Sequence, residues 1–280
     1  MSALEEETIL TAIDFLWPQP SRYVDQAINV IRSGFELKMM TADIARLSIN
    51  GMIRAMMVDS SREAAVLDTV AQATSISNTP EIVTAVIESL VGLPEASELI
   101  DYWASIAILG QLLTVSRLHP EVCNCLLTNI TSENGQAKQC IVESLGYAVN
   151  KAEEINQIIL NLLLATIESG SEGMRIKSVR ILRKVVLNDL CLGITIDQLD
   201  TLWLFTKYEI MKPDWKHRNL FSPEIPENPV HIQLVMDSCA ILRHLVAASK
   251  MPLMELPGAL SRLPQQLKDD YARLLRNPLL

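Results

Sequence analysis

Two helix starts 40 residues apart constrain the fold of this chain more than any other feature of its sequence. Thr79-Pro80-Glu81-Ile82 and His119-Pro120-Glu121-Val122 share one form, and the second lies 40 residues after the first. Proline is favoured at the first position of a helix because it has no N–H to lose there. A carboxylate in the first turn faces the positive end of the helix dipole. The two segments therefore predict equivalent helices that begin at Pro80 and Pro120.

A second repeat supports the first. Apolar residues recur at offsets of 36 and then 37 residues, in the sets Ile106, Val142 and Val179; Leu109, Leu145 and Leu182; Leu112, Ala148 and Val185; and Leu113, Val149 and Val186. Helix pairs that repeat at about 40 residues are typical of armadillo and HEAT proteins. We therefore expect an all-α, armadillo/HEAT-like α-solenoid that forms one domain over residues 1–280.

Helical periodicity runs along the whole chain, and strand-like alternation is nearly absent. Short stops rich in Pro, Gly, Ser and Asn separate the apolar segments. The helices that this pattern predicts cover 4–17, 21–33, 41–58, 60–75, 80–92, 95–116, 120–130, 136–150, 152–169, 173–188, 196–210, 230–249 and 264–276.

Composition excludes several classes of function. The chain has a net charge of −9, which argues against a dominant nucleic-acid surface, because phosphate binding needs concentrated Lys and Arg. The mean hydropathy is +0.21, yet no apolar run reaches the roughly 18 residues of a membrane helix. The first ten residues, "MSALEEETIL", are acidic where a signal peptide is basic. An odd count of five cysteines suggests reduced thiols inside the cell.

Cys123 and Cys125 lie one residue apart and raise the question of a metal or redox site. At the 40-residue offset they match Val83 and Ala85, which are small apolar residues. A zinc site would need further Cys or His at ligand spacing, and only His119 is close in sequence. We interpret both cysteines as small core residues and expect neither a metal nor a cofactor.

Catalytic motifs are missing from the sequence. It contains no phosphate-binding glycine loop, no H-E-x-x-H and no G-x-S-x-G elbow. The four histidines are scattered, and the acid pairs are adjacent residues that point in different directions on a helix. We therefore expect a protein that is not an enzyme.

Two segments could bind a partner. In "EGMRIKSVRILRKVV", Lys177, Arg180 and Lys184 are spaced by three and four residues, so they share one helix face. The pattern favours an ordinary solvated face with extended side chains; the alternative is a basic strip for an acidic peptide or an RNA backbone. The second segment is a long proline-rich loop, 208–229, that carries Trp215 and Phe221. Long ordered loops are often functional, although a variable insertion explains this one equally well.

The stretch "IESGSEGMRIKSVRILRKVVLNDLCL", residues 167–192, resembles a helix-turn-helix of the "required for cell differentiation" family. That family is the armadillo-type subunit of the Ccr–Not mRNA deadenylase complex. The matching elements within the stretch are the turn Glu168-Ser169-Gly170-Ser171-Glu172, then Ile181-Leu182, Lys184, Leu187 and Asp189. Further matches occur in the expected order at 119–121, 241–252 and 263–269, so that the resemblance covers roughly residues 100–280.

The resemblance implies a non-enzymatic adaptor for mRNA deadenylation and translational repression. It would dock on the large Not scaffold subunit and recruit regulators through short helical or tryptophan-bearing peptides. Some members of the family dimerise, so a homodimer is also implied, and the expected location is cytoplasmic, with the nucleus as an alternative. The family's peptide groove has an aromatic residue, a glycine and an aliphatic residue where this chain has Gln136, Glu143 and Lys177. Polar groups there would weaken the binding of an apolar anchor. Arg243 matches a position near the family's tryptophan pockets.

Two alternatives remain at this level. The chain could be a generic HEAT or armadillo scaffold in an unrelated assembly. The match at 167–192 would then be a coincidence of the sequence pattern that helical repeats share. It could also bind RNA or DNA through Arg175–Lys184, in which case the affinity would fall steeply with salt.

Overall fold

The structure is a computed structural model, and it describes residues 3–16, 21–92, 99–115, 117–151 and 156–187, together with positions 237 and 241. These residues form α-helices and contain no β-strand. The helices are α1 (Ala3–Asp14), α2 (Ser21–Glu36), α3 (Ala42–Val58), α4 (Glu63–Ala73), α5 (Pro80–Val91), α6 (Leu99–Leu112), α7 (Pro120–Thr131), α8 (Gly135–Lys151), α9 (Gln157–Ser169) and α10 (Glu172–Leu187), with a short 3₁₀ turn, η1 (Ser60–Arg62), before α4. None of these helices is long and apolar enough to span a membrane.

The chain divides into two compact units, residues 1–151 and residues 152–280. The first unit contains α1–α8, and the second contains α9 and α10. The prediction of one domain over 1–280 stays a prediction. The helices expected at 196–210, 230–249 and 264–276 and the loop expected at 208–229 lie outside the described residues.

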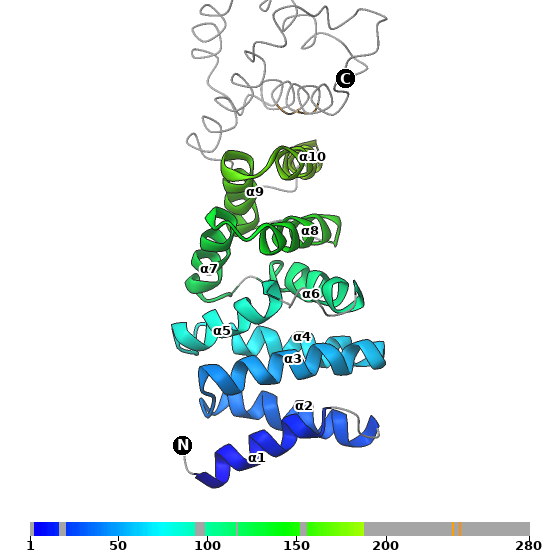
Figure 1. Cartoon of the computed structure of the whole chain (residues 1–280), viewed down its shortest axis with the longest axis vertical. Helices are drawn as coiled ribbons and strands as arrows, with labels where there is room; N and C mark the ends of the chain where they lie inside the picture. Colours follow the sequence, from blue (N-terminus) through cyan, green and yellow to red (C-terminus); the bar gives the residue numbers. More distant parts are fainter. Residues whose placement is uncertain are drawn as a thin grey trace, which may run out of the picture. The chain divides into compact units, whose positions relative to one another are not determined.

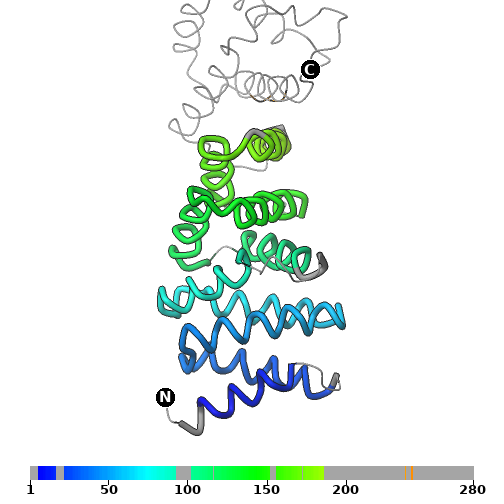
Figure 2. The backbone as a smooth tube through the Cα atoms, in the orientation of Figure 1, coloured from blue at the N-terminus to red at the C-terminus, as the bar shows by residue number. Residues whose placement is uncertain are grey.

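The helices of the first unit pack in two rows. In the first row, α1 contacts α3, α3 contacts α5, and α5 contacts α7; in the second row, α2 contacts α4, α4 contacts α6, and α6 contacts α8. Consecutive helices also pair across the rows, as α1 does with α2 and α7 does with α8. Figure 1 shows α5 and α7 on one side and α6 and α8 on the other, and Figure 2 shows the backbone rising from one helix pair to the next within this unit. The unit is therefore a stack of helix pairs with its core between the rows.

The two helix starts predicted from the sequence are confirmed. α5 begins at Pro80 and α7 begins at Pro120, with an acidic residue in each first turn. The caps differ in detail, because Nδ1 of His119 accepts a hydrogen bond from the backbone N–H of Glu121 at 3.0 Å. Thr79 makes no such cap.

The second repeat also lies where the sequence predicts. Leu109 of α6, Leu145 of α8 and Leu182 of α10 are buried. The same holds for the other matched positions that the structure describes: Ile106, Val142, Val179, Leu112, Ala148, Val185, Leu113 and Val149. The 36- and 37-residue offsets thus identify the inward stripe of each of these helices.

The helix predicted over 60–75 is divided in the structure. The carboxylate of Asp59 accepts a hydrogen bond from the N–H of Ser61 at 3.1 Å, and a 3₁₀ turn follows before α4 starts at Glu63. This turn buries Arg62, whose guanidinium lies 3.1 Å from a carboxylate oxygen of Asp25 and 3.2 Å from the carbonyl oxygen of Ala55. The turn therefore places the Arg62 side chain where it contacts both α2, through Asp25, and α3, through Ala55.

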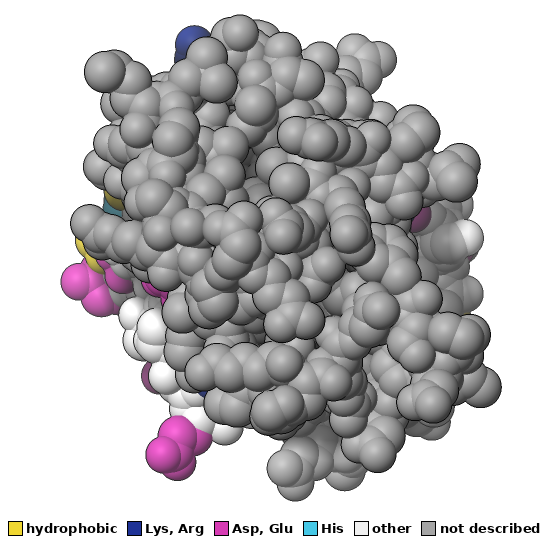
Figure 3. Space-filling view, turned by 90° about the horizontal axis from the view of Figure 1, so that it is seen from above, with side chains coloured by type: hydrophobic (Ala, Val, Ile, Leu, Met, Phe, Trp, Pro, Cys, Tyr) yellow, Lys and Arg dark blue, Asp and Glu magenta, His cyan; other side chains and the backbone are white. Residues whose placement is uncertain are grey.

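Charge is divided unequally between the two units. Residues 1–151 contain 18 Asp and Glu against 9 Lys and Arg, whereas residues 152–280 contain 15 of each. The whole net charge of −9 therefore belongs to the first unit. Acidic side chains (magenta) are among the described residues that are visible in Figure 3.

Candidate functional site

A chain of part-buried polar contacts connects helices of the second row. The side-chain amide of Gln111 in α6 donates to a carboxylate oxygen of Glu63 in α4 at 2.5 Å. The same amide lies 3.5 Å from the hydroxyl of Tyr147 in α8, and the ammonium of Lys151 lies 5.9 Å from the centre of the Tyr147 ring. These contacts connect α4, α6 and α8, the helices of the second row.

Trp103 is the most exposed aromatic side chain among the described residues, at 57% of its surface. It lies on α6 beside Tyr102, with the ring centres 5.9 Å apart and the rings at 68°, an edge-to-face arrangement. Such pairs are favoured by the charge distribution of aromatic rings. The indole of Trp103 therefore faces solvent beside the ring of Tyr102.

Two of the predicted site residues lie on α8, in the same row. Gln136 is exposed and Glu143 is half-buried. Burial is the main cause that raises the pKa of Tyr102 to about 12, and the charges of the Cys140 thiol and the Glu143 carboxylate contribute less.

The hydroxyl of Tyr102 is buried and has no hydrogen-bond partner. With its pKa raised to about 12, this group stays neutral at physiological pH.

The basic residues predicted to share a helix face lie on α10. Lys177, Arg180 and Lys184 are all exposed. The structure adds a partner that the sequence does not predict, because Arg183 donates to Asp237 at 2.7 Å and Arg180 lies 4.0 Å from the same carboxylate. Asp237 is only 1% exposed. Arg180 therefore belongs to an ion-pair cluster of the second unit as well as to the exposed face.

The remaining predicted residues lie outside the described part of the chain. They are Trp215, Phe221 and Arg243. A groove that combines Gln136 and Glu143 with Lys177 would need both units, so it stays a prediction.

The cysteine pair is explained mainly by packing. Cys125 is buried, as predicted, but Cys123 is only half-buried, because it falls at the edge of the inward stripe of α7. Burial raises the pKa of both thiols, for Cys125 to about 11 with Glu88 and Glu121 nearby. Among the residues that the structure describes, no three His, Cys, Asp or Glu side chains are arranged to hold a metal ion.

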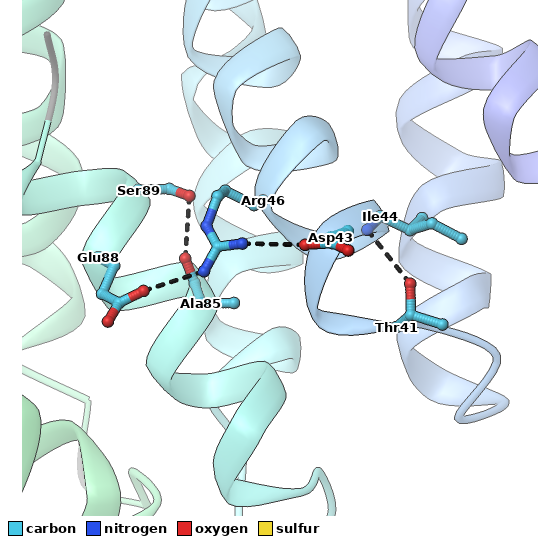
Figure 4. A network of polar contacts seen from close by, with 7 residues as sticks. All are labelled: Thr41, Asp43, Ile44, Arg46, Ala85, Glu88 and Ser89. Carbon is cyan, nitrogen blue, oxygen red and sulfur yellow. Dashed lines mark hydrogen bonds and ion pairs between the residues drawn. The ribbon is translucent and has the colours of Figure 1, made fainter.

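The first row carries an exposed charge network of a different kind (Figure 4). The guanidinium of Arg46 in α3 lies 3.1 Å from Asp43 of the same helix and 3.0 Å from Glu88 of α5. Thr41 caps α3 by accepting from the N–H of Ile44 at 3.3 Å. These contacts connect neighbouring helices of one row, and the carboxylates are already paired with an arginine.

Sequence reasoning missed Tyr102 and Trp103. The segment 95–116 is apolar on nearly every side, so its periodicity does not show which aromatic residue faces solvent. A tryptophan directly after the tyrosine was the only available signal.

Comparison with known proteins adds no assignment. The sequence matches no family model, and no curated protein is significantly similar to it.

Proposed function

We propose that this chain is a non-enzymatic adaptor that binds protein partners and that it has an armadillo/HEAT-like solenoid fold. The observation that carries the proposal is the two-row packing of α1–α8, in which each helix contacts the helix two positions later. Repeat proteins of this class bury a continuous core between stacked helix pairs and present long surfaces to partners. The apolar positions shared by α6, α8 and α10 support the same interpretation.

Within this class we propose a role in the Ccr–Not deadenylase complex. Within the stretch that resembles the "required for cell differentiation" family, 167–192, the structure describes residues 167–187, which form the end of α9, a turn and α10. The turn expected at 168–172 separates Ser169, where α9 ends, from Glu172, where α10 begins. The proposed activity is recruitment of regulators to the deadenylase, and the nuclease would reside in other subunits.

Affinity capture tests this proposal. The full chain carries a tag and is purified from cell extract, and its partners are identified by mass spectrometry. The proposal predicts the Not scaffold and deadenylase subunits among them. A different and stable set of partners would retain the adaptor function and exclude the Ccr–Not role.

One observation favours a second candidate, a scaffold of an unrelated assembly. Helices α1–α5 lie before the part of the chain that resembles the family, yet they pack in the same two rows as α6–α8. A general helical-repeat scaffold would have this uniform packing without any link to mRNA decay. Direct binding to the Not scaffold separates the two candidates.

A further inference from the structure

We propose that Asn134 and Gly135, at the start of α8, form a spontaneous modification site at which the folded chain loses the side-chain amide of Asn134. The products are an ordinary aspartate and an isoaspartate, in which the main chain runs through the former side chain. This inference does not depend on the proposed function. It follows from the chemistry of the Asn-Gly dipeptide and from the different surroundings of its two copies in the chain.

The reaction needs only the chain and water. The backbone nitrogen of the residue after an asparagine attacks Cγ of the asparagine side chain, the bond between Cγ and Nδ2 breaks, and the proton of the backbone nitrogen leaves with the amide as ammonia. Water then opens the resulting five-membered succinimide at either of its two carbonyl carbons, which gives aspartate or isoaspartate. Glycine is the most favourable second residue, because it has no side chain to obstruct its nitrogen and has the widest choice of backbone angles.

The first of the two dipeptides, Asn50-Gly51, lies in the middle of α3 and is half-buried. There the backbone N–H of Gly51 belongs to the hydrogen-bonded helix, so the ring can close only after the helix opens. A Cβ atom at Gly51 would be 2.6 Å from Cδ1 of Leu16. Packing against Leu16 therefore explains why this residue is a glycine, and the helix protects its asparagine.

The second dipeptide, Asn134-Gly135, is exposed and lies where α8 begins. Gly135 is the first residue of the helix, and the first N–H groups of a helix have no acceptor within it. A Cβ atom at Gly135 would meet nothing within 4 Å, so packing does not require a glycine at this position. The nitrogen that must attack is therefore not held by helical hydrogen bonds, in contrast with the nitrogen of Gly51.

The cap of α8 prepares the other reacting group. Oδ1 of Asn134 accepts hydrogen bonds from the backbone N–H groups of Gln136 and Ala137, each at 3.1 Å. Both donors polarise the carbonyl group whose carbon is attacked. They also stabilise the negative charge that develops on this oxygen, as the donors of an oxyanion hole do, and the positive end of the helix dipole acts in the same direction. The folded chain therefore favours attack at Asn134.

The two products affect α8 differently. An aspartate at position 134 keeps an oxygen acceptor for the cap and places a negative charge at the positive end of the helix. In isoaspartate the former side-chain carbonyl becomes part of the main chain, so the helix loses the acceptor that bound Gln136 and Ala137. The modification therefore weakens the start of one helix of the first unit as the protein ages.

Peptide mapping of the full chain tests the proposal. The purified protein is incubated in mildly alkaline buffer, and samples are digested at acidic pH in water enriched in heavy oxygen, which marks any conversion that occurs after sampling. Mass spectrometry measures the converted fraction at each dipeptide, and electron-transfer fragmentation distinguishes isoaspartate from aspartate. We expect Asn134 to convert about 10-fold faster than Asn50 or more, because only Asn50 requires local unfolding. In urea the two rates should become similar.

One variant and a matched control locate the reaction. Gly135→Ala adds a methyl group to the attacking residue in open surroundings, and we expect it to slow the conversion of Asn134 about 10-fold or more. Gly173→Ala makes the same change at the start of α10, where a Cβ atom also meets nothing within 4 Å, and should leave the rate at Asn134 unchanged. Circular dichroism checks that both variants remain folded.

Three results would overturn the proposal. The first is conversion of Asn134 in the folded chain that is no faster than conversion of Asn50. The second is an unchanged rate at Asn134 in folded Gly135→Ala. The third is conversion of Asn134 to aspartate alone, because opening of a succinimide must also give isoaspartate.

Discussion

Gly110 of α6 lies directly against Tyr147 of α8. A Cβ atom at residue 110 would be 2.7 Å from Cδ1 of the tyrosine and 2.9 Å from the carbonyl oxygen of Ser144. The glycine therefore sets the distance between two helices of the second row. We predict that Gly110→Ala lowers the free energy of unfolding by about 1–3 kcal/mol, because the backbone of α8 must shift. Urea denaturation measures the change. Gly135→Ala is the control, since a Cβ there meets nothing within 4 Å, and equal stabilities of the two variants would contradict the packing.

His119 should stabilise α7 more than Thr79 stabilises α5, although the two residues occupy the same position in the repeat. Only His119 caps its helix through a side-chain hydrogen bond. We predict that His119→Ala costs about 1 kcal/mol of stability, that His119→Asn retains most of the cap, and that Thr79→Ala has a smaller effect. Thermal unfolding of the three variants checks this order. A larger loss for Thr79→Ala would show that the cap does not stabilise the helix.

Arg62 and Arg46 each contact two carboxylates, but they should differ in their effect on stability. The side chain of Arg62 is 6% exposed and bridges Asp25 and Asp59, whereas the side chain of Arg46 is 43% exposed. We predict that Arg62→Ala costs about 3 kcal/mol, because buried hydrogen bonds and packing are lost, and that Arg46→Ala costs less than about 1 kcal/mol. Chemical denaturation at low salt gives both values. Similar losses for the two variants would contradict the difference in burial.

Lys38 has a backbone φ of 58° at the turn after α2, in the left-handed region that favours glycine. We predict that Lys38→Gly leaves the stability unchanged or raises it by about 1 kcal/mol, because the strain of a side chain in this region is relieved. The same substitution inside α8, Lys138→Gly, should lower the stability by about 1 kcal/mol. A lower melting temperature for Lys138→Gly, with none of this loss for Lys38→Gly, would support the backbone geometry. A loss at Lys38 as large as that at Lys138 would refute it.

The thiols of Cys125 and Cys140 should react slowly in the folded chain. Burial is the largest cause that raises their pKa values, to about 11 and about 12, from an ordinary value of 9.0. A thiol with a higher pKa is less ionised at a given pH. At pH 8 the thiolate fraction of Cys125 is therefore about 100-fold lower than that of an unperturbed thiol, and alkylation slows accordingly. Peptide-resolved mass spectrometry with iodoacetamide measures the rate. If Cys125 reacts in the folded chain as fast as in urea, it does not lie in the core.

The sequence predicted the local parts of the fold well for physical reasons. Proline at Pro80 and Pro120 restricts where a helix can begin, and the recurring aliphatic residues exemplified by Leu109 and Leu145 must face a core. Both signals depend only on neighbouring residues and on helical spacing. They therefore do not require knowledge of which segments meet in space.

Features that depend on distant partners were not predictable in this way. Asp237 meets Arg183 from 54 positions further along the chain, and Arg62 is buried because Asp25, 37 positions earlier, pairs with it. Trp103 was missed because α6 is apolar on nearly every side, so no polar face marks the solvent side. Tertiary contacts decide the environment of each of these side chains.

Direct binding to the Not scaffold is the measurement that tests the central claim most directly. The purified full chain is mixed with the purified helical segment of the scaffold and examined by size-exclusion chromatography with light scattering. The proposed adaptor role in the Ccr–Not complex predicts a stable complex of the two proteins that elutes as one species. Separate elution of the two proteins at micromolar concentrations, with no deadenylase subunits captured from extract, would contradict it.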